Sequence, residues 1–177
     1  MTAHAPLAFL WGDLSQPDAL PAECQLVGLR LEEIPTFYGE MDMSSTTLTR
    51  VYEFAASHRL HVPSQSAERN FELFGKCNNP AGHGHNYVVE VTVSGEPDSV
   101  TGMIAPLDVL DQKVSELVVD RYDHKNLNCD LPEFEGKPTT SETVANEIFA
   151  RLEGNLPAKL ERVRLWETAR SCFEVRA

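Results

Sequence analysis

The sequence predicts an α+β fold in which two strands, two helices and two further strands follow one another in a single domain. Apolar residues alternate in the first two and the last two of these segments, and they recur at helical spacing in the middle two. In chain order the six segments are 47–58, 83–93, 107–118, 144–152, 160–168 and 172–175.

The two leading strands each carry histidine at one end of an apolar row. Alternate residues of a strand share a face, so His58 belongs to the row that begins with Tyr52. The second strand opens with His83 and His85 and then becomes apolar. The polar segment 61–72 between the strands contains a proline, and we predict that it is a loop.

Both predicted helices have recognisable start signals. Pro106 suits the start of the first helix, whose apolar positions are Leu107, Leu110, Val114, Leu117 and Val118. Thr139 with Glu142 three residues later forms a capping-box pattern before the second helix. The apolar stripe of that helix comprises Val144, Ala145, Ile148 and Leu152.

Composition excludes several classes of function. The chain is 42% hydrophobic and 24% charged, as in soluble globular proteins. Its net charge of −12 argues against nucleic acid or an anionic membrane as partner. No apolar run approaches the ~20 residues that span a bilayer. The four widely spaced cysteines favour reduced thiols in the cytoplasm over a disulfide framework.

Residues 1–42 differ from the rest of the chain. They contain seven acidic residues and one basic residue, Arg30, with poor periodicity apart from a short element near 25–34. We expect this acidic extension to be loosely attached, disordered or not native to the protein, and dispensable for folding. Met43 is the alternative start, and the domain proper is predicted to cover 43–177.

The segment 73–87 carries the strongest chemical signal. Cys77 precedes a turn-forming Asn-Asn-Pro-Ala-Gly stretch, which we expect to fold the cysteine back toward His83 and His85. Two histidines separated by one residue point the same way on a strand, and neutral imidazoles are ligands for zinc or copper. The alternative is that the histidines are ordinary polar residues at a strand end and Cys77 is a small buried apolar residue.

Together with His58, the two histidines would leave one position of a tetrahedral zinc ion open, as in catalytic sites. Cys77 would then be available as a base or nucleophile, with the Asp123–His124 pair keeping the thiol ionised. The alternative for that pair is a polar surface turn. Glu167 lies on the apolar face of the predicted strand 160–168, so it needs a specific polar partner.

Five segments together resemble the 6-pyruvoyltetrahydropterin synthase family, which includes the 6-carboxytetrahydropterin synthases of queuosine biosynthesis. The segments occur in the family's order, and the fifteen-residue central one is highly specific. They are Phe54–Leu60, Leu73–Tyr87, Asp123–Leu127, Thr139–Glu142 and Glu167–Thr168.

The resemblance implies a T-fold, a four-stranded antiparallel sheet with two helices on one face. It further implies that three subunits close into a barrel, that two trimers stack into a homohexamer, and that the sites lie between subunits. The implied zinc ligands are His58, His83 and His85. The other implied site residues are Cys77 as proton-abstracting base, Asp123 and His124 as its activating pair, Glu167 as pterin anchor and possible relay member, and Glu142 with Thr140 as further pterin contacts.

The implied reaction is the elimination of triphosphate from 7,8-dihydroneopterin triphosphate to give 6-pyruvoyltetrahydropterin, a carbon–oxygen lyase step of tetrahydrobiopterin biosynthesis. The Cys-x5-His-Gly-His spacing and the long loop before Cys77 favour this branch. The alternative is the 6-carboxytetrahydropterin branch, a carbon–carbon lyase that also releases acetaldehyde. Ser141 replaces a threonine of the animal-type motif but keeps the hydroxyl. A zinc hydrolase or a non-catalytic pterin-binding assembly would leave Cys77 and Glu167 without a role.

Overall fold

The computed structural model describes residues 4–177 of the chain. The helices and strands, in chain order, are α1 His4–Leu14, β1 Gly28–Ile34, β2 Phe37–Asp42, β3 Thr46–His58, α2 Ala67–Phe74, η1 Gly75–Asn78, β4 His83–Ser94, α3 Leu107–Val114, η2 Ser115–Val119, α4 Asp120–Tyr122, β5 Lys125–Asn126, η3 Pro132–Phe134, α5 Ser141–Leu152, β6 Lys159–Thr168 and β7 Ser171–Arg176.

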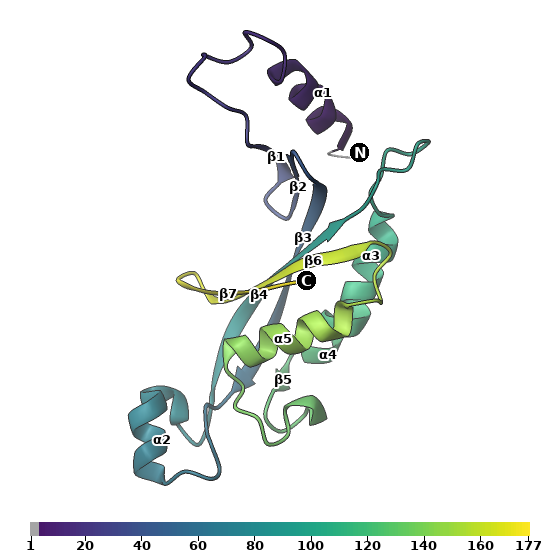
Figure 1. The fold of residues 1–177 in the computed structure, drawn as a ribbon. Helices are drawn as coiled ribbons and strands as arrows, with labels where there is room; N and C mark the ends of the chain where they lie inside the picture. The colour runs from purple at the N-terminus through teal and green to yellow at the C-terminus, as the bar shows by residue number, and fades with distance from the viewer. Residues whose placement is uncertain (1–3) are drawn as a thin grey trace.

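One twisted sheet organises the molecule, and its strands lie in the order β1-β2-β3-β4-β6-β7 (Figure 1). All neighbours along this path are antiparallel. The short strand β5 pairs in parallel with the end of β3. Helix α5 and the continuous helix formed by α3, η2 and α4 lie together on one face of the sheet (Figure 1).

The predicted α+β fold is confirmed. The four strands expected from the sequence are β3, β4, β6 and β7, and the two expected helices are α3–α4 and α5. The sheet is wider than the four strands predicted, because β1, β2 and β5 add to it. The wide π-type turn η2 lies within the first helix, so its apolar stripe continues through a local distortion.

The core lies between the sheet and these helices. Strand register places Val89 opposite Leu165, both fully buried, and the ring of Phe54 stacks on Tyr87 with centroids 5.0 Å apart. The predicted helix stripes supply the other side of the core. Their fully buried members are Leu110, Val114, Val118, Val144, Ala145, Ile148 and Leu152. Burial of this apolar surface, worth about 25 cal/mol per Å², fixes which face of each strand points inward.

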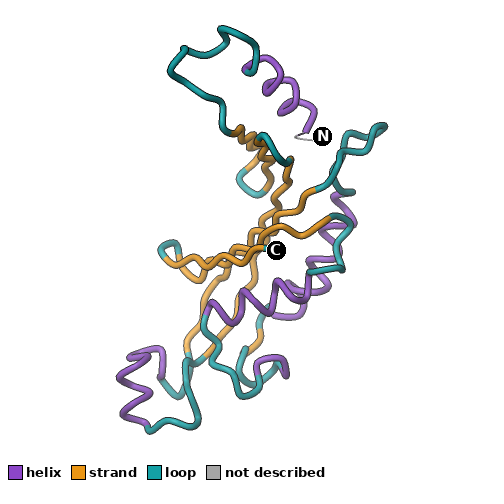
Figure 2. Tube along the Cα trace, viewed as in Figure 1, coloured by secondary structure: helices purple, strands orange, loops and turns teal. Residues whose placement is uncertain are grey.

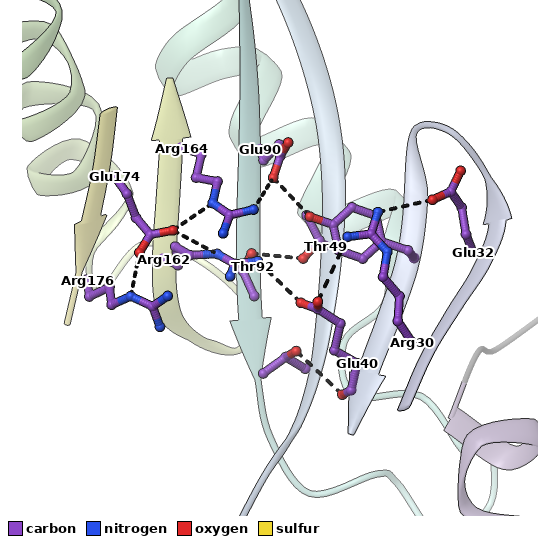
Figure 3. A network of polar contacts seen from close by, with 12 residues as sticks. Arg30, Glu32, Glu40, Thr49, Glu90, Thr92, Arg162, Arg164, Glu174 and Arg176 are labelled. Atoms are coloured by element: carbon purple, nitrogen blue, oxygen red, sulfur yellow. Dashed lines mark hydrogen bonds and ion pairs between the residues drawn. The ribbon is translucent and has the colours of Figure 1, made fainter. Parts of the chain in front are cut away.

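The opposite face of the sheet is polar (Figure 3). Glu90 is at the centre of a network there and accepts hydrogen bonds from Tyr38, Arg164 and the indole N–H of Trp166. Further arginines and glutamates alternate across the strands from β1 to β7 (Figure 3). The apolar and polar faces are therefore segregated, and the histidine rows of β3 and β4 belong to the apolar, helix-covered face.

Residues before Met43 are more regular than their sequence pattern indicates. The hairpin of β1 and β2 extends the sheet, and β2 pairs with the first residues of β3 from Thr46 to Arg50. Phe37 and Tyr38 of this hairpin are 5% and 2% exposed. Short strands with many charged residues show little periodicity, and here neighbouring strands supply the burial that orders them.

Two local predictions were wrong. Part of the expected loop 61–72 belongs to helix α2, which stands apart from the sheet with its flanking loops (Figure 2). Ser66 caps this helix by accepting a hydrogen bond from the Arg69 N–H at 3.2 Å. The cap of α5 is Thr140 rather than Thr139, because the Thr140 hydroxyl accepts the N–H of Thr143.

Across residues 4–177, each helix is too short or too polar to traverse a lipid bilayer.

Candidate metal centre

The three predicted histidines converge at the open end of the core. His58 ends β3 and His83 begins β4, and the register pairs these two residues directly. His85 lies two residues further along the same face. One nitrogen from each ring lies within 4.8 Å of the others, so the trio could hold a metal ion.

The turn before β4 enforces this register. Asn79 accepts hydrogen bonds from the N–H groups of Ala81 and Gly82, as expected for a tight turn. Gly82 has φ of 72°, and a Cβ there would lie 2.9 Å from the carbonyl oxygen of His58. Glycine is therefore required at Gly82, whereas the space beside Gly84 in the His-Gly-His triplet is ordinary.

The outer nitrogen of His58 is held by the backbone. Its Nδ1 lies 2.8 Å from the carbonyl oxygen of Thr139. A carbonyl only accepts, so Nδ1 carries the proton and Nε2 presents a lone pair to the cluster. Nε2 of His58 is 3.2 Å from Nε2 of His83. This arrangement, a metal-facing nitrogen opposite a backbone-bound one, is typical of metal-ligating histidines.

The electrostatics also suit a cation. Burial lowers the pKa of His58 and of His85, which favours the neutral imidazole that binds metal. Nε2 of His85 is buried and lacks a hydrogen-bond partner among residues 4–177. A metal ion in the cluster would supply that partner, so the donor set fits a divalent transition metal.

Glu167 reaches the same cluster from the end of β6. Its Oε1 lies 3.5 Å from Nε2 of His58 and 3.8 Å from Nε2 of His85. The side chain is 21% exposed. The sequence predicted that this carboxylate on an apolar strand face meets a specific polar partner, and the imidazoles are that partner.

Cys77 lies near the histidines in the chain path but outside their cluster. It belongs to η1, is half-buried, and accepts the N–H of Leu60 on its carbonyl oxygen at 2.9 Å. This bond ties the cysteine to the chain two residues after His58. The expected fold-back of the cysteine therefore brings its backbone to the strand end that carries the first histidine.

Asp123 and His124 form the predicted pair at the end of the first helix. Asp123 accepts the N–H of Ala55 at 2.8 Å, and its second oxygen is 2.7 Å from Nδ1 of His124. These contacts lower the pKa of Asp123, chiefly through the Ala55 N–H. His124 is 83% exposed and lines an open groove of about 600 Å³ together with His85 and Asn126. Within one chain, the pair lies outside the histidine cluster.

Thr140 and Glu142 start helix α5 immediately after the Thr139 carbonyl that holds His58. Glu142 is exposed and Thr140 is half-buried. The structure thus places the turn that carries both residues beside the metal-facing imidazole of His58.

Sequence reasoning missed two supporting residues, Thr139 and Asn128. Asn128 accepts the N–H of Arg59 at 2.7 Å and donates to the Arg59 carbonyl and the Thr139 hydroxyl, each at 3.1 Å. It therefore joins the residue after His58 to the residue whose carbonyl holds His58. Only the Thr-Thr-Ser-Glu motif pointed toward this region, and nothing in the local pattern singles out Asn128.

The chain is similar to known proteins over its sheet and covering helices. A family model described as 6-pyruvoyl tetrahydropterin synthase matches residues 47–177. The chain is 48% identical over 122 residues to a 6-pyruvoyl tetrahydrobiopterin synthase of Poecilia reticulata, covering 68% of this chain and 83% of that protein. Its identity to the Homo sapiens protein of that name is 47% over 122 residues, covering 68% and 84%.

A solved structure points the same way. The structure of Caenorhabditis elegans 6-pyruvoyl tetrahydropterin synthase superposes with a TM-score of 0.70 at 41% identity, covering 74% of this chain and 94% of that one. The matched region includes every residue of the histidine cluster together with Cys77, Asp123, His124 and Glu167. The chain belongs to the 6-pyruvoyl tetrahydropterin synthase family.

Proposed function

We propose that this protein is a zinc-dependent lyase that converts 7,8-dihydroneopterin triphosphate to 6-pyruvoyltetrahydropterin with release of triphosphate. The observation that carries the proposal is the convergence of His58, His83 and His85 beside the Glu167 carboxylate in a chain of this family. The names of the relatives support the same product.

The three imidazoles would hold one zinc ion. Bound there, zinc would act as a Lewis acid that makes the C–H and O–H groups of the substrate side chain more acidic. Three protein ligands leave a position for a substrate hydroxyl, and this is the usual design of a catalytic zinc site.

Recognition of the pterin ring is assigned to carboxylates and a hydroxyl near the cluster. We propose that Glu142, Thr140 and Glu167 contact the amino-pyrimidine edge, where two parallel N–H donors match one carboxylate. The start of α5 supports this, since Thr140 and Glu142 directly follow the carbonyl that holds His58.

Proton transfer is assigned to Cys77, with His124 as relay and Asp123 as the group that orients it. The Asp123–His124 contact of 2.7 Å supports the orienting role. The proton taken from the side chain and the loss of triphosphate leave a pyruvoyl group, and the ring gains the hydrogens that make it a tetrahydropterin. No external oxidant or reductant is required.

Each complete site is proposed to lie between subunits. The exposed imidazole of His124 points out of its own chain, as expected for a group that serves a neighbouring subunit. We propose that 43–177 forms the T-fold domain, that three copies close a barrel and that two trimers form a homohexamer. The four cysteines are all unpaired, which supports a reducing, cytoplasmic environment.

The test is metal-dependent release of triphosphate. Purified protein is stripped of metal with a chelator, and half is reloaded with one equivalent of zinc. Both samples are then incubated with 7,8-dihydroneopterin triphosphate. We expect triphosphate release from the zinc-loaded sample and a loss of at least a hundredfold in the stripped one. Equal release from both samples, or none from either, would contradict the proposal.

A further inference from the structure

We infer that Glu167 is the fourth metal ligand in the substrate-free protein. The inference rests on the metal site proposed above and adds to it the residue that fills the position left by the three histidines. Its basis is the position of one carboxylate oxygen, Oε1, relative to the imidazole nitrogens.

The distances match the edges of a ligand tetrahedron. Ligands bound to zinc at about 2.0–2.1 Å lie about 3.3–3.4 Å from one another in tetrahedral geometry. Nε2 of His58 is 3.2 Å from Nε2 of His83 and 3.5 Å from Oε1 of Glu167. Nε2 of His85 is 3.8 Å from the same oxygen. The carboxylate oxygen thus stands where a fourth ligand belongs.

Direct hydrogen bonding between these groups is a poorer explanation. N–H···O hydrogen bonds are typically ~2.7–3.2 Å long, shorter than either contact of Glu167. Nε2 of His58 presents a lone pair, because the proton is on Nδ1 against the Thr139 carbonyl. A carboxylate facing a lone pair is repelled unless a cation lies between them, and a shared metal ion removes that repulsion.

Charge balance favours the same assignment. His58 is fully buried and Glu167 is only 21% exposed, so a divalent cation held by three neutral imidazoles would be a large buried charge. One carboxylate in the coordination sphere halves that charge and offsets part of its desolvation cost.

This arrangement gives Glu167 two successive roles. Without substrate, the carboxylate closes the coordination sphere. When a substrate hydroxyl takes the fourth position, the carboxylate is freed beside the bound molecule and becomes an acceptor for its N–H groups. The anchoring role proposed for Glu167 is thereby coupled to substrate entry.

The experiment measures metal binding alone, with the full-length protein, Zn²⁺ and Co²⁺. Three proteins are compared: wild type, Glu167→Gln and the control Glu161→Gln. Glu161 is on the same strand but bonds Lys159 and Ser94. We expect Glu167→Gln to bind zinc at least ~10-fold more weakly, as supporting residues of metal sites typically cost 10–100-fold. Its Co²⁺ complex should show altered visible d–d bands, while Glu161→Gln matches wild type.

Chemical rescue separates ligation from folding. Glu167→Ala should regain the wild-type type of Co²⁺ spectrum when acetate is added, because acetate supplies the missing carboxylate. Zinc affinity and Co²⁺ spectra of Glu167→Gln identical to those of Glu161→Gln would overturn the inference and leave the three-histidine site intact. Wild-type protein that binds neither metal would instead refute the metal site itself.

Discussion

Nδ1 of His58 lies 2.8 Å from the carbonyl oxygen of Thr139, 81 residues further along the chain. This contact joins the end of β3 to the start of α5. It fixes the tautomer of a fully buried imidazole and places the Thr140–Glu142 turn beside the metal-facing side of that ring. Asn128 stabilises the contact by binding both Arg59 and Thr139.

We therefore predict that Asn128→Ala weakens zinc binding without removing any ligand. The substitution leaves the Arg59 N–H without its acceptor, which should cost about 1–3 kcal/mol of stability. Freed from the clamp, the Thr139 carbonyl should hold His58 less well, and zinc affinity should fall ~10-fold or more. Competition with a chromophoric chelator measures the affinity, and thermal unfolding measures the stability.

The matched control is Asn155→Ala, since the Asn155 amide only bonds nearby carbonyls at the end of α5. If Asn128→Ala and Asn155→Ala bind zinc equally well, Asn128 stabilises the fold without positioning the metal ligand.

The second prediction concerns the histidine cluster. Wild-type protein should contain about one zinc per chain, and His83→Ala should lose most of it under conditions where wild type is saturated. Removal of one of three protein ligands should weaken binding more than the ~10–100-fold loss caused by a supporting residue. Metal analysis after gel filtration gives the stoichiometry.

His61→Ala serves as the control, because His61 contacts Asn78 rather than the cluster. Full zinc occupancy in His83→Ala would show that the ion is bound elsewhere.

The third prediction separates Cys77 from the metal. Cys77→Ala should bind zinc and substrate nearly as wild type does, yet lose most turnover, because only the proton-abstracting thiol is removed. General-base catalysis typically contributes ~10²–10⁴-fold. Initial rates and calorimetric binding distinguish the two effects. The exposed Cys129→Ala should behave as wild type. A Cys77→Ala variant with more than about a tenth of the wild-type rate would rule out the cysteine as the base.

The fourth prediction concerns the residues before the family match. A chain starting at Met43 should fold, but with lower stability than the full chain. It lacks the buried Phe37 and Tyr38 and leaves part of β3 unpaired. Burial of such side chains is worth roughly 1.5–3 kcal/mol each, so unfolding should cost at least ~2 kcal/mol less.

A second truncated chain, lacking only residues 1–27, keeps the hairpin and should lie closer to wild type. Equal stability of the full chain and the chain from Met43 would show that the hairpin contributes no net stabilisation. Failure of the shorter chain to fold would refute 43–177 as an independent domain.

The sequence predicted the parts of the site that follow from strand geometry. His58, His83 and His85 could be placed on one face because alternate strand residues point the same way, and the apolar rows identified that face as buried. Glu167 was recognisable as a carboxylate in a buried row. The antiparallel sheet and both covering helices followed from the same periodicities.

Other features depend on contacts that no local pattern contains. The hairpin before Met43 is ordered by pairing with β3, and α2 depends on one serine cap and on Asn70, which binds backbone groups around it. Asn128 acts on residues far away in the sequence. The coupling of Glu167 to the imidazoles required atomic distances, because face assignment alone does not say which polar partner a buried carboxylate meets.

The most direct test of the account is the mass of the product that the zinc-loaded protein makes from 7,8-dihydroneopterin triphosphate. The account predicts 6-pyruvoyltetrahydropterin, with its three-carbon side chain retained, and one triphosphate released per turnover. A 6-carboxytetrahydropterin product accompanied by acetaldehyde would contradict it and assign the protein to the carbon–carbon lyase branch.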